Sequence, residues 1–327
     1  MTGARDSVDD GSGVTLVLGP SDDLRAEVFI RARTSPGMAE PRLDGTLVGP
    51  RCRRASTLPV VARLASAAST PGTAALARTV LTEPSYWTPD LPNLYRLEVR
   101  LADGDRTVTT FDLMVGLRRL GVRGRSFWLD GRRWVPRGVA RAAEACDPVA
   151  LHEAGLAVAV ADPPDGLCAA ADEIGMPIIG VLGAASGAAL DRRSSIDRIA
   201  SWAIHPSVAL AVVPAEAPRD DVATIVAEAR RLKGTLLIGH AVDGGLPPAA
   251  VAEGIDFLMV RMVGTSLPHP AWRAAVPALP LVAWRSGQSG WGGDRHGCDV
   301  LQADLAAWGQ AGGAERLAWD WAGYVVV

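Results

Sequence analysis

The 327-residue sequence lacks a basic excess, long apolar runs and clustered metal ligands, which would point to a nucleic-acid-binding, membrane or metal-binding protein. Lys233 is the sole lysine, and 33 basic residues face 36 acidic ones, for a net charge of −3. A nucleic-acid-binding surface would need a basic excess, so the composition argues against one. We attribute the preference for arginine and alanine to a GC-rich bacterial gene rather than to function.

Long apolar runs and clustered metal ligands are absent as well. No stretch is apolar for long enough to span a bilayer, and residues 1–12 lack the basic start and apolar run of a signal peptide. We therefore expect a cytoplasmic protein without a membrane span, beginning with a disordered acidic tail at 1–12. Four cysteines show neither CxxC pairing nor metal-ligand spacing, so we expect reduced thiols. They are Cys52, Cys146, Cys168 and Cys298. We expect no metal and no cofactor.

Short strands separated by glycine, proline and serine clusters are present from residue 14 onward. They are expected at 14–18, 24–33, 58–64 and 74–81, and as a hairpin at 94–101 and 107–115. Asp103-Gly104 is a turn signal for that hairpin, and Asp130-Gly131 for a shorter one. The number and length of these strands predict a β-sandwich at 13–120, followed by a connecting hairpin at 121–132.

From residue 133 onward, short apolar runs alternate with helical patterns, which is typical of repeated β/α units around a parallel sheet. Strands are expected at 134–138, 157–160, 177–181, 208–213, 235–238, 256–261, 280–284 and 316–319. The clearest helices are expected at 148–154, 167–174, 191–204 and 218–232. Eight strands are what a closed (β/α)8 barrel requires, so we predict such a barrel at 133–327.

Several short motifs follow one another along the chain. They are Trp87, Pro89, Pro92-Asn93-Leu94-Tyr95, Gly116-Leu117-Arg118, Phe127-Trp128-Leu129-Asp130-Gly131 and Arg137-Gly138-Val139, then Asp172-Glu173, His205-Pro206-Ser207 and Ala318-Trp319-Asp320-Trp321. Their order resembles that of the family 2 glycoside hydrolases, which include β-galactosidases, β-glucuronidases and β-mannosidases. The resemblance implies an immunoglobulin-like sandwich joined to a (β/α)8 barrel. A jelly roll precedes the sandwich in larger members of that family, and we expect no counterpart of it in this sequence.

The resemblance also locates the two carboxyl positions that a retaining glycosidase needs, one acid/base and one nucleophile. It places the acid/base at Glu216, preceded by Ala215 where the family has asparagine, and it places Arg285 at the nucleophile position. A guanidinium stays protonated and cannot attack an anomeric carbon. We expect Arg285 to point into the barrel and pair with Glu216, which would lower the pKa of that carboxyl. Glu216 is then a vestigial acid/base position.

Other side chains at the expected strand ends could still bind a sugar or supply a relocated nucleophile. Aromatic rings stack on sugars, although tryptophan also fills cores and interfaces. The carbohydrate-binding candidates are Trp284, Trp291, Trp319 and Asp320. The candidates for a relocated nucleophile are Glu144, Asp162, Asp243 and Asp320.

Three hypotheses follow. The first is a catalytically degenerate relative that acts as a carbohydrate-binding or assembly component, with a protein partner or a second copy of itself. The second is an active retaining β-glycosidase that uses Glu216 with a relocated carboxylate. The third is a purely structural subunit of a larger complex.

Overall fold

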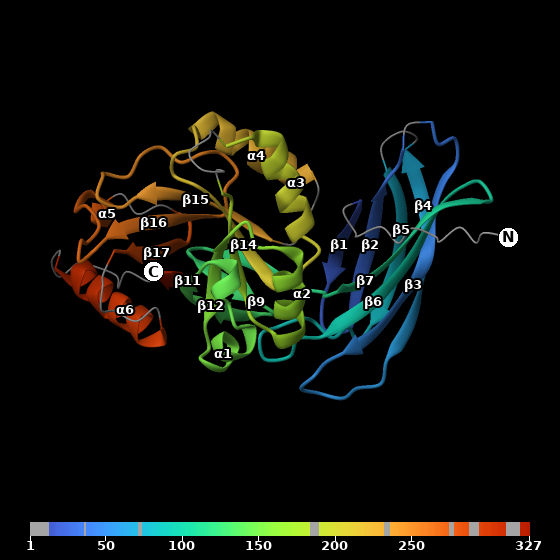
Figure 1. Ribbon diagram of the computed structural model, residues 1–327, viewed down its shortest axis with the longest axis horizontal. Coiled ribbons are helices and arrows are strands. Elements are labelled where there is room, and N and C mark those ends of the chain that lie inside the picture. Colours follow the sequence, from blue (N-terminus) through green and yellow to red (C-terminus); the bar gives the residue numbers. More distant parts are fainter. Residues whose placement is uncertain are drawn as a thin grey trace.

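A computed structural model of the chain describes residues 13–35, 37–70, 74–183, 190–231, 236–274, 278–287, 294–311 and 321–327. It contains a β-sandwich and a barrel that lie side by side along the long axis of the molecule (Figure 1). A small three-stranded sheet lies between them in the sequence. The described helices are too short or too polar to cross a membrane.

The sandwich is built from seven strands, which hydrogen-bond in the order β1-β2-β5-β4-β3-β6-β7. They are β1 (Val14–Ser21), β2 (Arg25–Arg33), β3 (Pro41–Arg51), β4 (Val60–Thr70), β5 (Ala74–Thr82), β6 (Leu94–Asp103) and β7 (Arg106–Val115). The first part of β4 pairs with β3 and the second with β5, so β4 passes from one layer to the other. Alternate residues of both layers, such as Ile30 and Leu97, are fully buried between them.

Strand β3 was missing from the sequence-based prediction because prolines and glycines interrupt it. Gly45 shows why glycine is needed there. A Cβ at this position would collide with the backbone carbonyl of Glu98 on the neighbouring strand β6. A glycine inside a strand thus marks a close backbone approach rather than a strand end.

The three-stranded sheet closes one end of the barrel. Its strands are β8 (Leu120–Arg123), β9 (Ser126–Leu129) and β10 (Arg132–Trp134). Asp130 and Gly131 both have positive φ, as the predicted tight turn between β9 and β10 requires. Phe127 of β9 is fully buried, and its ring meets that of Phe257, at the start of a barrel strand, edge-on at 5.5 Å. The sheet therefore plugs the end at which the barrel strands begin.

Eight parallel strands form the closed barrel, in sequence order. They are β11 (Arg137–Ala140), β12 (Ala157–Ala161), β13 (Ile178–Val181), β14 (Val208–Val213), β15 (Leu237–Asp243), β16 (Phe257–Val263), β17 (Leu281–Ser286) and β18 (Gly323–Val326). Strand β18 pairs with both β17 and β11, which closes the ring. The predicted fold class, an immunoglobulin-like sandwich followed by a (β/α)8-type barrel, is confirmed.

The prediction for the eighth strand was wrong. Residues 316–319 lie outside the described residues, and the strand that closes the barrel is β18. The apolar run at the end of the sequence supplies its buried residues, Tyr324 to Val326, which suit a strand covered on both faces. The first strand also begins later than expected, at Arg137, because residues 132–134 belong to β10.

Helices cover the outside of the barrel (Figure 1). They are η1 (Ala143–Ala145), α1 (Pro148–Glu153), α2 (Asp165–Ile174), α3 (Arg192–Trp202), α4 (Arg219–Arg231), α5 (Ala271–Ala274) and α6 (Arg295–Gln310). Helices α1 to α4 match the four predicted helices to within about two residues at most ends. Helix α6 was not predicted, although Asp294 caps it by accepting a hydrogen bond from the Gly297 amide at 2.9 Å.

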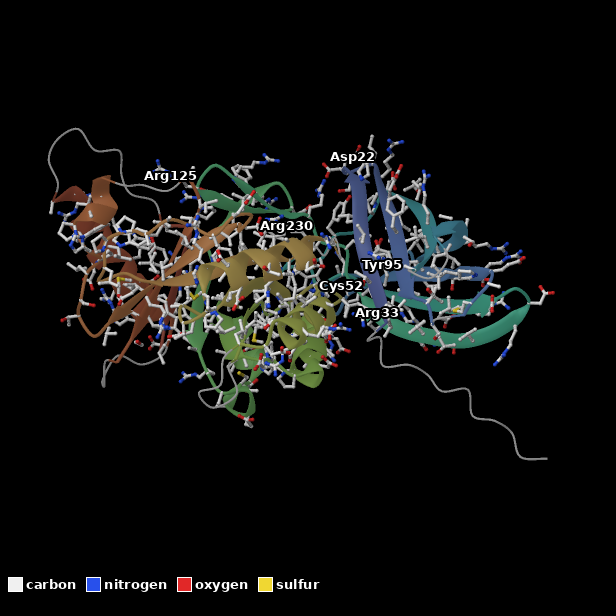
Figure 2. All side chains as sticks on the ribbon, turned by 90° about the horizontal axis from the view of Figure 1, so that it is seen from above. Asp22, Arg33, Cys52, Tyr95, Arg125 and Arg230 are labelled. Atoms are coloured by element: carbon white, nitrogen blue, oxygen red, sulfur yellow. The ribbon has the colours of Figure 1, made fainter. Side chains whose placement is uncertain are left out.

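Buried hydrogen bonds join the sandwich to the barrel. The indole Nε1 of Trp87 donates to the carbonyl of Asp172, in α2, at 2.9 Å. The guanidinium of Arg118 donates to the carbonyl of Pro206, and burial lowers the pKa of Arg118 to about 10. At the edge of this junction, Arg33 lies on the side of the sandwich that faces the barrel (Figure 2) and pairs with Asp197 of α3 at 3.2 Å.

Candidate site at the barrel mouth

The mouth of the barrel, where the eight strands end, is the place at which barrels of this kind carry their functional side chains. Alternate residues of each strand face the interior. On β17, Val282 and Trp284 pack against the interior cluster, whereas Leu281 and Ala283 pack between the strands and the helices. The two-residue period therefore places Arg285 on the outer face of the barrel.

Arg285 is 5% exposed and donates from Nη1 to the carboxylate of Asp304, on α6, at 2.6 Å. Its Nε and Nη2 atoms are buried and have no hydrogen-bond partner within the described parts of the chain. The expected Glu216–Arg285 ion pair was wrong. Strand β17 continues through Ser286, so the residue after the inward-facing Trp284 must turn toward α6.

Glu216 follows β14 and is 71% exposed at its side chain. Its carboxylate accepts a hydrogen bond from Nη1 of Arg261, on β16, at 2.7 Å. This hydrogen bond is the main cause that lowers the pKa of Glu216, and the charge of Arg261 adds to it. A general acid that works near neutral pH needs a raised carboxyl pKa, so the environment of Glu216 acts in the opposite direction.

Arg261 and Trp284 are direct neighbours across β16 and β17. Phe257 and Met259 of β16 belong to the interior cluster, so Arg261 continues the inward-facing row up to the mouth. Trp284 is half-buried against the same cluster. The mouth thus brings together Glu216, Arg261 and Trp284. We missed Arg261 in the sequence, although its spacing from Phe257 and Met259 could have revealed it.

His240, on β15, lies near Glu216. Burial lowers the pKa of His240, and the negative charge of Glu216 opposes this effect only in part. The Nε2 atom of His240 is buried and finds no hydrogen-bond partner among the residues that the structure describes. A lowered pKa keeps the imidazole neutral at neutral pH.

The other candidate carboxylates have local roles where they can be described. Asp162 pairs with Arg198 and accepts from the Gly183 amide at 3.1 Å, and Asp243 accepts from the Gly245 amide at 2.8 Å. Glu144 is exposed in η1. Trp291, Trp319 and Asp320 lie outside the described residues. Within the described ranges, no three histidine, cysteine or acidic residues gather as metal ligands would.

The sandwich and the closed barrel together resemble the fold of a solved glycosyl hydrolase family 2 member. Residues 52–118 match the model of the glycosyl hydrolases family 2. This match and the likeness of fold confirm the resemblance drawn from the motifs. A comparison with curated proteins found no match.

Solved structures similar to this chain include three with TM-scores above 0.6. A β-D-glucuronidase of Dictyoglomus thermophilum is 15% identical, with a TM-score of 0.62, over 96% of this chain and 61% of its own. A β-glucuronidase of Parabacteroides merdae is also 15% identical, with a TM-score of 0.63, over 96% and 46%. A glycosyl hydrolase family 2 member of Bacteroides cellulosilyticus is 15% identical, with a TM-score of 0.65, over 97% and 43%. The chain thus spans about half the length of these proteins.

Proposed function

We propose that this protein is a catalytically degenerate relative of the family 2 glycoside hydrolases, which binds carbohydrate at its barrel mouth without hydrolysing it. One observation carries the proposal: neither of the two positions that the resemblance assigns to catalysis is equipped for it. Arg285, at the nucleophile position, faces α6 and bonds Asp304. Glu216, at the acid position, is exposed and bonded to a cation that lowers its pKa.

The mouth nevertheless has the chemistry of a sugar-binding surface. The half-buried ring of Trp284 offers an apolar face on which a sugar ring can stack. Beside it, Arg261 offers guanidinium donors and Glu216 carboxylate acceptors, which form strong, directional hydrogen bonds with hydroxyl groups. A stacked ring with charged hydrogen-bonding groups at its edge favours a neutral or weakly charged saccharide.

Hydrolysis is tested first, with a panel of aryl glycosides and the wild-type and Glu216→Gln proteins. We expect no release of the aryl group above the uncatalysed rate from either protein. Turnover that Glu216→Gln abolishes would contradict the proposal. That result would support a retaining glycosidase with a relocated carboxylate.

Binding is tested by calorimetry against monosaccharides and oligosaccharides. We expect Trp284→Ala and Arg261→Gln each to weaken the binding of a recognised sugar by roughly tenfold, the effect of losing about 1.4 kcal/mol. Trp128→Ala is the matched control, because Trp128 stacks against Arg123 on the three-stranded sheet at the other end of the barrel. If no saccharide binds the wild type, carbohydrate recognition is excluded and a structural role remains.

A further inference from the structure

A second candidate site lies at the end of the barrel opposite its mouth. A cavity of about 500 Å³, open to solvent on one side, is lined there by the three-stranded sheet, by residues 88–91 of the sandwich and by the segments that lead into β11, β12 and β13. This volume is within the range of about 300–1,000 Å³ that is typical of small-molecule pockets.

The register of the three-stranded sheet identifies the side chains that face this cavity. Arg132 pairs with Leu129, and Trp134 pairs with Phe127, across β10 and β9. Paired residues of neighbouring strands share a face, and Phe127 and Leu129 are buried toward the barrel. Arg132 and Trp134 therefore share that face and line the cavity. Arg133 alternates onto the opposite face with its partner Trp128, although it also borders the cavity.

Arg132 differs from the other arginines of this wall, Arg133 and Arg137, because its side chain has no protein partner within the described ranges. Arg137 donates to Asp299 at 2.9 Å and to Gln302 at 2.6 Å, and Asp130 accepts from Arg119. Within the described ranges, the side chain of Arg132 makes no hydrogen bond and no ion pair.

The rest of the wall is largely apolar, because Trp134, Pro136, Leu156 and Pro177 line it around Arg132. Prolines and a tryptophan present flat apolar surfaces, against which a ring packs well. Of the two acidic groups in the wall, Asp130 is paired with Arg119, so Asp90, on the sandwich side, is the one that an anion would have to avoid.

We propose that this cavity binds a small organic anion, with its acidic group on Arg132 and its aromatic or apolar ring against Trp134. A carboxylate and a phosphate share the chemistry that Arg132 recognises, since both accept two hydrogen bonds from one guanidinium. The site is independent of the barrel mouth, so it stands or falls separately from the proposed carbohydrate binding.

Calorimetry with naphthoate, naphthyl phosphate and neutral naphthol tests the inference on the full chain. We expect saturable binding of at least one of the two anions and much weaker binding of naphthol. The tighter of the two anions identifies the acidic group. Arg132→Gln should weaken that binding roughly tenfold or more, and Asp90→Asn should strengthen it by removing a repulsive charge.

Arg125→Gln is the matched control. Arg125 belongs to the same sheet, is exposed at the turn between β8 and β9 (Figure 2), and does not line the cavity. Binding in this variant should equal that of the wild type. Trp134→Phe, which keeps a ring in place, should retain binding, and Trp134→Ala should lose it. Two results would overturn the inference: no saturable binding of either anion, or equal losses in Arg132→Gln and Arg125→Gln.

Discussion

The buried carboxylate of Asp172 ties α2 to the segment before β14, directly beneath the sandwich–barrel junction, and its replacement by asparagine should destabilise the whole protein. Asp172 is 3% exposed and accepts hydrogen bonds from Nδ1 of His205 at 2.7 Å and from the Ser207 amide at 2.8 Å. An asparagine has one acceptor oxygen and one NH2 group, so one of these two buried donors would lose its acceptor.

The size of the effect follows from this geometry. Removing one partner of a buried charged pair costs about 3–5 kcal/mol. The asparagine oxygen can still accept from the Ser207 amide, so we expect a loss of about 3 kcal/mol in the free energy of unfolding, at the low end of that range. Urea unfolding followed by circular dichroism measures it. Glu173→Gln is the control, because Glu173 is the next residue but bonds Arg53 on the surface, where the loss should be about 0–1 kcal/mol.

The same substitution should change the dependence of stability on pH. Burial alone would lower the pKa of His205, but the hydrogen bond and charge of Asp172, with a smaller contribution from Asp165, outweigh burial and raise it. A raised folded-state pKa means that protonated His205 stabilises the protein. This contribution is fully present below the unfolded pKa of about 6.5 and is lost as the pH rises through the higher folded pKa.

The stability difference between wild type and Asp172→Asn should therefore be larger at about pH 6 than at about pH 8. His240, with its lowered pKa, favours the opposite trend, but it is present in both proteins and cancels in the difference. A variant as stable as wild type would refute the role of Asp172 at the junction. A stability difference that does not change with pH would refute its link to His205.

Four further substitutions test other parts of the fold by urea unfolding. Gly175→Ala should lower the free energy of unfolding by about 1–3 kcal/mol, because Gly175 has a φ of +87° and an added Cβ would collide with the Pro89 carbonyl. Unchanged stability would contradict this contact. Phe127→Ala should lower the free energy of unfolding by about 3–5 kcal/mol, because the buried ring plugs the barrel end. A loss below about 1 kcal/mol would mean that this plug contributes little to stability. Arg285→Met should leave stability unchanged or raise it, whereas Asp304→Ala should lower stability by leaving a buried guanidinium without its carboxylate. If Arg285→Met were instead the less stable of the two variants, the outward orientation of Arg285 would be contradicted.

Much of the fold could be predicted from the sequence because it follows from local rules. The two-residue alternation and the turns at Asp103-Gly104 and Asp130-Gly131 predicted the hairpins that the structure contains. The helical patterns located α1 to α4. Strand β3 was missed because its glycines serve contacts with a strand distant in sequence, which local patterns do not reveal.

The site was harder to predict because it depends on which residues of each strand face the barrel interior and which face outward. The predicted seventh strand ended at residue 284, whereas β17 continues to Ser286 and keeps its two-residue period. A shift of one residue moves a side chain from the mouth to the outer face, so Arg285 was assigned to the wrong side of the barrel. The same period places Arg261, which the prediction did not consider, at the mouth as the cation that pairs with Glu216.

The motifs that carry the family resemblance lie mainly at the junction of sandwich and barrel, and this explains why the resemblance predicts fold better than function. Trp87 and Arg118 donate to barrel carbonyl groups, and Asp172 and His205 form the buried pair beneath them. These residues orient one domain against the other and bear no relation to the chemistry at the mouth. A sequence can therefore keep every one of them whatever side chains its barrel mouth carries. Asp172→Asn and Glu216→Gln should separate the two properties. We expect the first to unfold the protein more easily, and the second to leave the free energy of unfolding within about 1 kcal/mol of wild type, because Glu216 is exposed.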